Sequence, residues 1–213
     1  MAYAIARELG FQPNQVDWIG QSEFGLAFAP GDKDFDLHLG QVTVTDERAQ
    51  AVDFSDSYYD ATQAIVALAD NPITEVTSLE ELKDFRLAAP GNTTSFRIIE
   101  DDIQPNVEPR APDSIASGTQ QLANGQFDGL VVDTPTAFYI RDGELPFDPF
   151  NVTGVVIGEI PTPTGEIFGA VLDKDSPLTA CVNQAIAVLR ENGRQQQLLD
   201  LWINEANDAP PLR

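Results

Sequence analysis

The chain has 213 residues, of which 34 are acidic and 12 are basic, so its formal net charge is −22 at pH 7. This charge argues against binding nucleic acid or an anionic membrane surface, because both ligands require basic patches. The sequence contains no apolar run of about 18 residues that could span a membrane, no glycine-rich phosphate loop and no cluster with metal-ligand spacing. We therefore expect a globular protein with no bound cofactor and no metal.

The hydrophobic pattern predicts strands that alternate with helices along the chain. Predicted helices cover residues 2–9, 78–84, 95–100, 114–123, 134–140, 178–191 and 194–202. Predicted strands cover residues 16–19, 35–43, 61–69, 86–89, 127–132 and 168–172. The alternation predicts an α/β fold with mainly parallel sheets. Cys181 lies at helical spacing with the apolar residues of 178–189, so we expect it to be a small core residue.

One arginine stands at a predicted strand-to-helix corner. The β-branched run 42–44 ends in Thr45, which can cap the helical turn that carries Arg48. A guanidinium in such a place can fork a carboxylate. Judged from the residue and its position alone, however, an arginine that is solvated or paired with a neighbouring acid is more common than one that binds a ligand carboxylate.

Two further segments carry polar groups at the ends of predicted elements. Residues 91–94, Gly-Asn-Thr-Thr, precede a helix, so their N–H groups suit an anion, although an ordinary helix cap has the same sequence. Asp133 ends a buried strand and could either face a ligand or cap the helix that starts at Thr134. His38, between two leucines, is expected to be structural.

Thr45-Asp-Glu-Arg48, a short spacer and then Val-Asp-Phe-Ser-Asp-Ser-Tyr-Tyr at 52–59 resemble the signature of the family 3 periplasmic amino-acid-binding proteins, the receptors of polar amino-acid ABC importers. Three later segments resemble the family's motifs in the family's order, and the resemblance runs from residue 1 to about residue 203. These segments are 122–133, 165–172 and 182–193.

The resemblance implies a type II periplasmic-binding-protein-like α/β fold, with two α/β lobes joined by two crossing strands. Lobe 1 would comprise residues 1–61 and 166–213, and lobe 2 residues 63–163. The chain opens inside what is the first helix of the family, so we expect the first strand of lobe 1 to be missing from this sequence, together with any signal segment.

The resemblance also assigns ligand contacts in lobe 1. Arg48 matches the arginine that forks the α-carboxylate of the ligand, and Thr43 matches the position that binds the ligand through its N–H and hydroxyl groups. Gln41 would accept a hydrogen bond from the α-ammonium through its backbone carbonyl. Trp18 resembles an aromatic platform under the ligand side chain, although filling lobe 1 is an equal alternative for this residue.

In lobe 2, the resemblance adds a carboxylate contact and an ammonium contact. The family has a Gly-Thr-Thr or Gly-Ser-Thr turn that helps to bind the carboxylate, and the extra Asn92 leaves Thr93 and Thr94 as alternatives for this contact. Asp133 resembles the aspartate that receives the α-ammonium.

The resemblance implies a receptor without catalytic residues that captures a free amino acid between its lobes and delivers it to an ABC transporter permease. The alternatives are a ligand-binding sensory domain and an enzyme similar to the cyclohexadienyl dehydratases on the same scaffold. We expect a monomer located in the periplasm or outside the cell, lipid-anchored in its full-length form.

Overall fold

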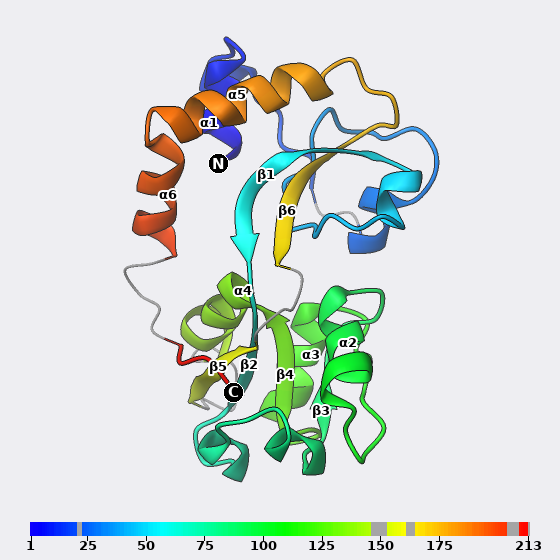
Figure 1. The fold of residues 1–213 in the computed structure, drawn as a ribbon, viewed down its shortest axis with the longest axis vertical. Coiled ribbons are helices and arrows are strands. Elements are labelled where there is room, and N and C mark those ends of the chain that lie inside the picture. Colours follow the sequence, from blue (N-terminus) through cyan, green and yellow to red (C-terminus); the bar gives the residue numbers. More distant parts are fainter. Residues whose placement is uncertain (21–22, 146–152, 161–164, 204–208, 213) are drawn as a thin grey trace. The chain divides into compact units, whose positions relative to one another are not determined.

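The computed structural model describes residues 1–20, 23–145, 153–160, 165–203 and 209–212. The chain divides into two compact units, each with its own sheet and core (Figure 1). Unit 1 comprises Met1–Ala61 and Glu166–Ala206, and unit 2 comprises Thr62–Gly165 and Asn207–Arg213.

Unit 1 is built on a two-stranded antiparallel sheet of β1 (Asp53–Ala61) and β6 (Glu166–Leu172). Its helices are α1 (Ala2–Glu8), α5 (Thr179–Glu191) and α6 (Arg194–Trp202). Helices α1 and α5 pack together, and α5 also packs on β1. The core of unit 1 includes buried residues of α1, β1, β6 and α5, namely Ile5, Tyr58, Phe168, Ala185, Ile186 and Leu189.

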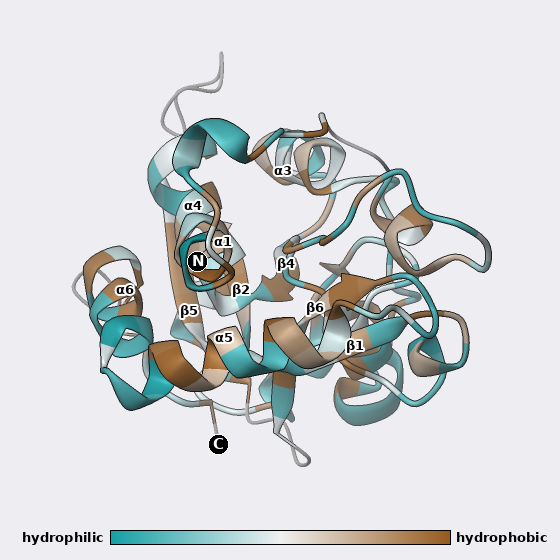
Figure 2. Cartoon of the chain, turned by 90° about the horizontal axis from the view of Figure 1, so that it is seen from above, coloured by the Kyte–Doolittle hydropathy of each residue, from teal (hydrophilic) through white to brown (hydrophobic). Residues whose placement is uncertain are grey.

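Helix α5 buries one apolar stripe, and apolar and polar stretches alternate along it in Figure 2. The stripe begins at Val182, so Cys181 lies just outside it and is exposed. The expectation that Cys181 is a core residue is wrong. A helical position one residue from a buried one is turned by about 100°, which is enough to leave the core-facing side.

Two strands predicted in unit 1 are not formed. Residues 16–19 pair with no strand among the described residues, and Trp18 is 65% exposed. Residues 35–43 contribute only isolated bridges to β6, His38 to Val171 and Thr43 to Phe168. The backbone between these two bridges turns at Gln41, which has a φ of +56°. A positive φ breaks the extended conformation that a continuous ladder requires.

Unit 2 contains a four-stranded sheet in the order β3-β4-β2-β5. The strands are β2 (Gln63–Leu68), β3 (Leu87–Ala88), β4 (Gly129–Asp133) and β5 (Gly154–Ile160). Strand β2 runs antiparallel to both β4 and β5, and only the β3–β4 pairing is parallel among the described strands. The predicted mainly parallel sheets are therefore wrong, because β2 separates the parallel pair from β5 and runs opposite to both of its neighbours.

Both faces of this sheet are covered. The side chains of β2 alternate between two cores: Ile65 packs with α2 (Thr94–Ile98) on one face, and Val66 packs with α3 (Ile115–Ala123) and α4 (Thr134–Tyr139) on the other. Two π-helical segments, Ile99–Ile103 and Ile140–Glu144, continue α2 and α4. Burial on both faces explains why β2 is a continuous apolar run after Gln63 instead of an alternating one.

The last described residues, 209–212, pack on unit 2. The N–H of Glu159 in β5 donates to the carbonyl of Pro210 (2.9 Å), and the N–H of Leu212 donates to the carbonyl of Glu159 (2.8 Å). Leu212 is 2% exposed and belongs to the core of unit 2. This differs from the predicted lobe 1, which takes in residues 166–213. The edge of β5 that does not pair with β2 supplies the N–H and carbonyl groups that bind this segment.

A short 3-10 helix takes the place of one longer predicted helix. The helix predicted over 78–84 is the single turn Glu81–Asp84, and other 3-10 helices among the described residues are Pro13–Gln15, Phe24–Phe28, Arg48–Gln50 and Pro72–Glu75. The Glu81 carboxylate still accepts from the N–H groups of Thr77 (2.8 Å) and Ser78 (3.2 Å), so the predicted capping interaction is partly present.

Candidate functional site

Arg48 is a buried cation of unit 1, with 9% of its surface exposed. Its backbone N–H donates to the Thr45 hydroxyl (3.2 Å) at the start of the 3-10 helix Arg48–Gln50. The sequence prediction that Thr45 caps this turn is therefore confirmed. The cap directs the arginine back toward the preceding segment, where its Nη1 donates to the Thr43 carbonyl (2.8 Å).

Two phenylalanines flank the Arg48 guanidinium. Its carbon atom Cζ lies 4.3 Å from the ring centre of Phe28 and 5.5 Å from that of Phe24. The two rings meet edge to face, with their centres 5.3 Å apart. Cation–π attraction holds the planar guanidinium against these rings. The sequence analysis missed both residues, although two phenylalanines four residues apart in an apolar segment were a visible signal.

Gln41 and Thr43 lie on the segment that meets β6. Thr43 is 4% exposed and bridges to Phe168, and the N–H of Val44 donates to the carbonyl of Ile167 (3.0 Å). Strand β6 thus fixes the backbone on which both predicted contacts depend. The turn at Gln41, marked by its positive φ, lies two residues before Thr43. Their roles toward a ligand stay predictions.

Trp18 contacts Tyr3 in this structure. Its indole N–H donates to the Tyr3 hydroxyl (2.9 Å), and the two rings meet edge to face with centres 5.5 Å apart. The aromatic rings described next to Arg48 are those of Phe24 and Phe28. The predicted role of Trp18 as a platform under the ligand therefore stays a prediction.

In unit 2, the two threonines hold different positions at the start of α2. Thr93 is the N-cap: its hydroxyl accepts from the N–H of Phe96 (3.2 Å) and donates to the Pro90 carbonyl (2.6 Å). Thr94 is the first helical residue, and the extra Asn92 is accommodated with a φ of +60°. The capping explanation holds for Thr93, and a ligand contact from either threonine stays a prediction.

Asp133 ends β4 and immediately precedes α4, but its side chain makes no capping hydrogen bond to that helix. Its Oδ1 instead accepts from Nε2 of Gln63 (2.7 Å), the residue opposite it on β2. Gln63 is 0% exposed, and its Oε1 accepts from the Ser95 hydroxyl (2.6 Å). The sequence analysis missed Gln63, the one polar residue of the otherwise apolar strand β2.

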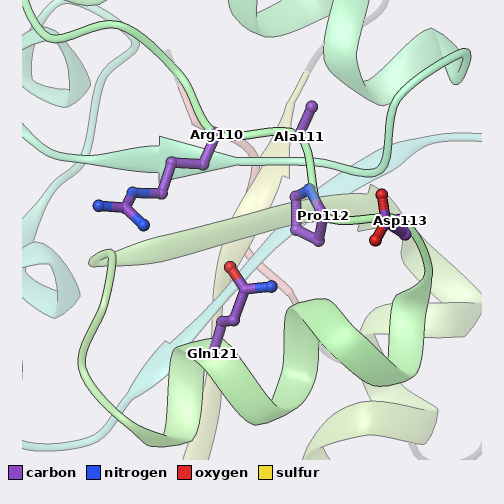
Figure 3. A pocket seen from close by; sticks show the side chains of 5 residues that line it. All are labelled: Arg110, Ala111, Pro112, Asp113 and Gln121. Carbon is purple, nitrogen blue, oxygen red and sulfur yellow. The ribbon is translucent and has the colours of Figure 1, made fainter.

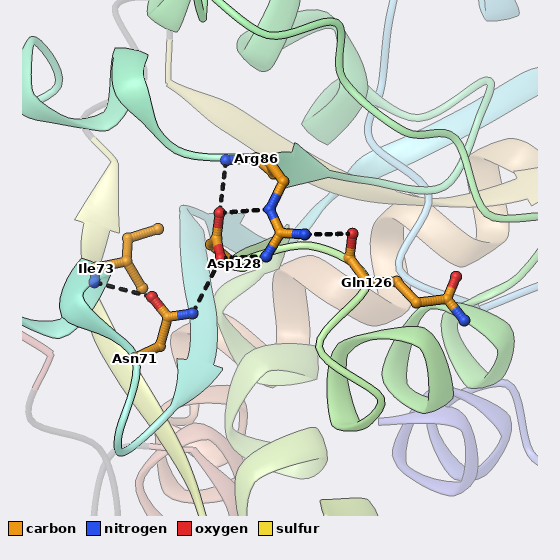
Figure 4. Close-up of polar contacts among 5 residues, drawn as sticks. All are labelled: Asn71, Ile73, Arg86, Gln126 and Asp128. Atoms are coloured by element: carbon orange, nitrogen blue, oxygen red, sulfur yellow. Dashed lines mark hydrogen bonds and ion pairs between the residues drawn. The ribbon is translucent and has the colours of Figure 1, made fainter.

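A second carboxylate, Asp128, stands just before the other end of β4 (Figure 4). It accepts from the N–H, Nε and Nη2 groups of Arg86, at 2.9, 3.0 and 2.7 Å, and from the Asn71 amide at 3.1 Å. These hydrogen bonds, chiefly those from the Arg86 side chain, lower the pKa of Asp128 to about 2. Arg86 directly precedes β3, so the pair fastens the starts of two parallel strands. Asp128 is therefore a structural anchor.

Unit 2 also has a cavity of about 270 Å³ beside α3, which none of the predicted ligand residues lines (Figure 3). Its lining residues are Arg110, Ala111, Pro112, Asp113 and Gln121.

Within the described part of the chain, no group of three or more His, Cys, Asp and Glu residues could hold a metal ion. In the same residues, every helix is too short or too polar to cross a membrane.

Sequence comparison then identifies the family. Residues 1–205 match the sequence pattern of the family described as "bacterial extracellular solute-binding proteins, family 3". The chain belongs to this family. Its fold is accordingly that of the type II periplasmic binding proteins, as the solved structures similar to it also show.

Named members of the family 3 solute-binding proteins align along most of the chain. A glutamine-binding protein of a Bacillus subtilis ABC transporter is 27% identical over 81% of this chain, and the match spans 59% of the length of that protein. The L-arginine-binding protein of Pseudomonas aeruginosa is 27% identical over 89% of this chain and 73% of its own. Among solved structures, an ancestral arginine-binding protein bound to glutamine has a TM-score of 0.75 and 27% identity, covering 95% of this chain and 84% of its own.

Proposed function

We propose that this chain is the substrate-binding receptor of an amino-acid ABC importer. The observation that carries the proposal is a pair of opposite charges, one in each unit: the Arg48 guanidinium held between two rings, and the Asp133 carboxylate held by Gln63. A free amino acid at neutral pH carries the matching pair, an α-carboxylate and an α-ammonium. The related proteins named for binding glutamine and arginine support the same ligand class.

In this proposal each unit binds one end of the ligand. Arg48 forks the α-carboxylate, assisted by the backbone and hydroxyl of Thr43, while Asp133 receives the α-ammonium. Charge-assisted hydrogen bonds of this kind contribute about 1.5–3 kcal/mol each. The ligand binds more tightly to a conformation of the protein in which both sets of contacts form. Ligand binding therefore shifts the conformational equilibrium toward that conformation.

The partner in this proposal is the transporter permease, which would receive the amino acid from the loaded receptor. The family description and the transporter names of the relatives support this partner and a location in the periplasm or outside the cell. Relatives named for binding proteins favour a receptor over an enzyme. A turnover assay with prephenate checks the dehydratase alternative directly.

A screen of the twenty L-amino acids by thermal shift, followed by calorimetric titration of those that respond, tests the proposal. We expect a polar or charged amino acid to stabilise the protein, because a bound ligand raises the free energy of unfolding by mass action. Glucose and maltose serve as controls and should produce no shift. Tight binding of a sugar with no response to any amino acid would overturn the proposal, and so would turnover of prephenate.

A further inference from the structure

We propose that Gln63 is a positioning residue that orients the Asp133 carboxylate toward the α-ammonium of the ligand and couples it to the start of α2. The inference rests on the proposed function, since it assigns a supporting residue to the ammonium contact. Gln63 is the first residue of β2, and its backbone pairs with Asp133 on one side and with Ile160 on the other. The sheet register therefore fixes the side chain beside the end of β4.

The hydrogen bonds of Gln63 join the two segments that carry the predicted contacts of unit 2. Its Nε2 donates to Asp133 Oδ1 (2.7 Å) and lies 3.5 Å from the Thr94 hydroxyl, while its Oε1 accepts from the Ser95 hydroxyl (2.6 Å). A carboxylate only accepts hydrogen bonds, so chemistry requires the NH₂ group to face Asp133 and the carbonyl to face Ser95. The Gln63 amide thus has one orientation, and its hydrogen bond in turn orients the Asp133 carboxylate.

Gln63 is buried, so its amide group requires hydrogen-bond partners within the protein. The side chain is 0% exposed, and the next four residues of β2 are apolar and also 0% exposed. An amide in such a place costs free energy unless its donors and acceptor are used. Removing it takes away the hydrogen bond that Gln63 donates to Asp133 and the one that it accepts from Ser95, and a buried polar group that loses its hydrogen bond costs more than the bond itself contributes.

A purely structural role and a positioning role differ in their effect on ligand binding. If Gln63 only stabilised unit 2, its replacement would lower stability and leave the ligand preference unchanged. If Gln63 aims Asp133, its replacement must weaken the recognition of the ammonium group specifically. Gln63 donates to the Asp133 carboxylate at 2.7 Å from a fully buried position, so a change at Gln63 acts directly on that carboxylate.

Gln63→Met tests the proposal, because methionine keeps the length of the side chain and removes both amide groups. Binding is measured by calorimetry with L-arginine and L-glutamine and with their des-amino analogues, 5-guanidinopentanoic acid and 4-carbamoylbutanoic acid. We expect about a tenfold loss of affinity for the amino acid, as for a hydrogen bond to a charged group. The affinity for the analogue, which lacks the ammonium, should stay within about twofold.

Two comparisons make the result specific. Thr119→Val removes another buried hydroxyl of unit 2, whose partner is the Ile115 carbonyl, and should lower stability without changing affinity. In an Asp133→Asn background, Gln63→Met should add less than about a twofold further loss, because the two residues act as one unit. Equal losses for the amino acid and its analogue, or additive losses in the double variant, would overturn the positioning role.

A measurement without ligand separates this proposal from the proposed function. If the wild-type protein binds no amino acid in the twenty-compound screen, the proposed function fails. Hydrogen exchange of the Gln63 side-chain NH₂ group, followed by NMR, then decides the geometry on which the positioning role depends. We expect these hydrogens to be protected in the wild type and to exchange much faster in Asp133→Ala. Equal exchange in both proteins would overturn the inference.

Discussion

Replacing Asp128 with alanine separates the structural carboxylate of β4 from the proposed binding carboxylate, Asp133. The Arg86 side chain is the main cause that lowers the pKa of Asp128 from 3.8 to about 2. This lowering corresponds to an upper limit of about 2.5 kcal/mol. Because the Arg86 side chain is 48% exposed, solvent screening reduces the contribution to about 1–2 kcal/mol. The hydrogen bond from the Asn71 amide is already among the causes of this lowering, so we expect a destabilisation of about 1–2 kcal/mol.

The pH dependence has a definite sign. The pKa of Asp128 is lower in the folded protein than in the unfolded chain, so its stabilising contribution is complete above pH 4 and is lost as the pH falls toward 2. The free energy of unfolding of the wild type should therefore decrease over this range. Asp128→Asn should show a smaller decrease, because the asparagine has no charge to lose.

Native-state hydrogen exchange of the amides of 130–132 reports the stability of β4 without assuming that the two units unfold together. Asp128→Ala should accelerate exchange at pH 7 and leave amino-acid affinity within about twofold of the wild type. Asp133→Ala should have the opposite effect: it should weaken amino-acid binding and change the exchange of these amides less than Asp128→Ala does. Unchanged exchange in Asp128→Ala, or the same loss of stability at low pH in Asp128→Asn as in the wild type, would refute the reasoning.

Three further predictions concern Arg48, Phe28 and Gly158. Arg48→Ala should weaken amino-acid binding in calorimetry by about 2–4 kcal/mol, and Arg48→Lys should also weaken it because lysine lacks the fork; unchanged affinity would make Arg48 a plain turn residue. Phe28→Leu should lower affinity by about 0.5–2 kcal/mol by releasing the guanidinium, with no loss if the ring only fills space. Gly158→Val should expose the amide of Leu212 to rapid hydrogen exchange, because a Cβ would lie 2.6 Å from the Pro210 carbonyl oxygen; continued protection would contradict this account of the chain end.

Local features of the chain could be predicted from the sequence. The cap of Thr45 on the Arg48 turn joins groups three residues apart, and the stripe of α5 repeats at helical spacing. Neighbouring residues are enough to specify both interactions, because a turn or helix brings positions three and four apart together whatever the rest of the chain does. The order of the motifs along the chain likewise identified the family.

The surroundings of the charged groups were decided only by the tertiary structure. Phe28 reaches Arg48 across 20 residues, Gln63 reaches Asp133 across 70, and Leu212 enters a core of unit 2 whose other members are distant from it in the sequence. Strand pairing sets the contact between Gln63 and Asp133, backbone hydrogen bonds to β5 hold Leu212, and the packing of two 3-10 helices brings Phe28 to Arg48. All three depend on which surfaces the whole chain can bury. The sequence by itself therefore indicated which residues bear charge and which turns present them. The packing of distant segments determined what holds each charge in place.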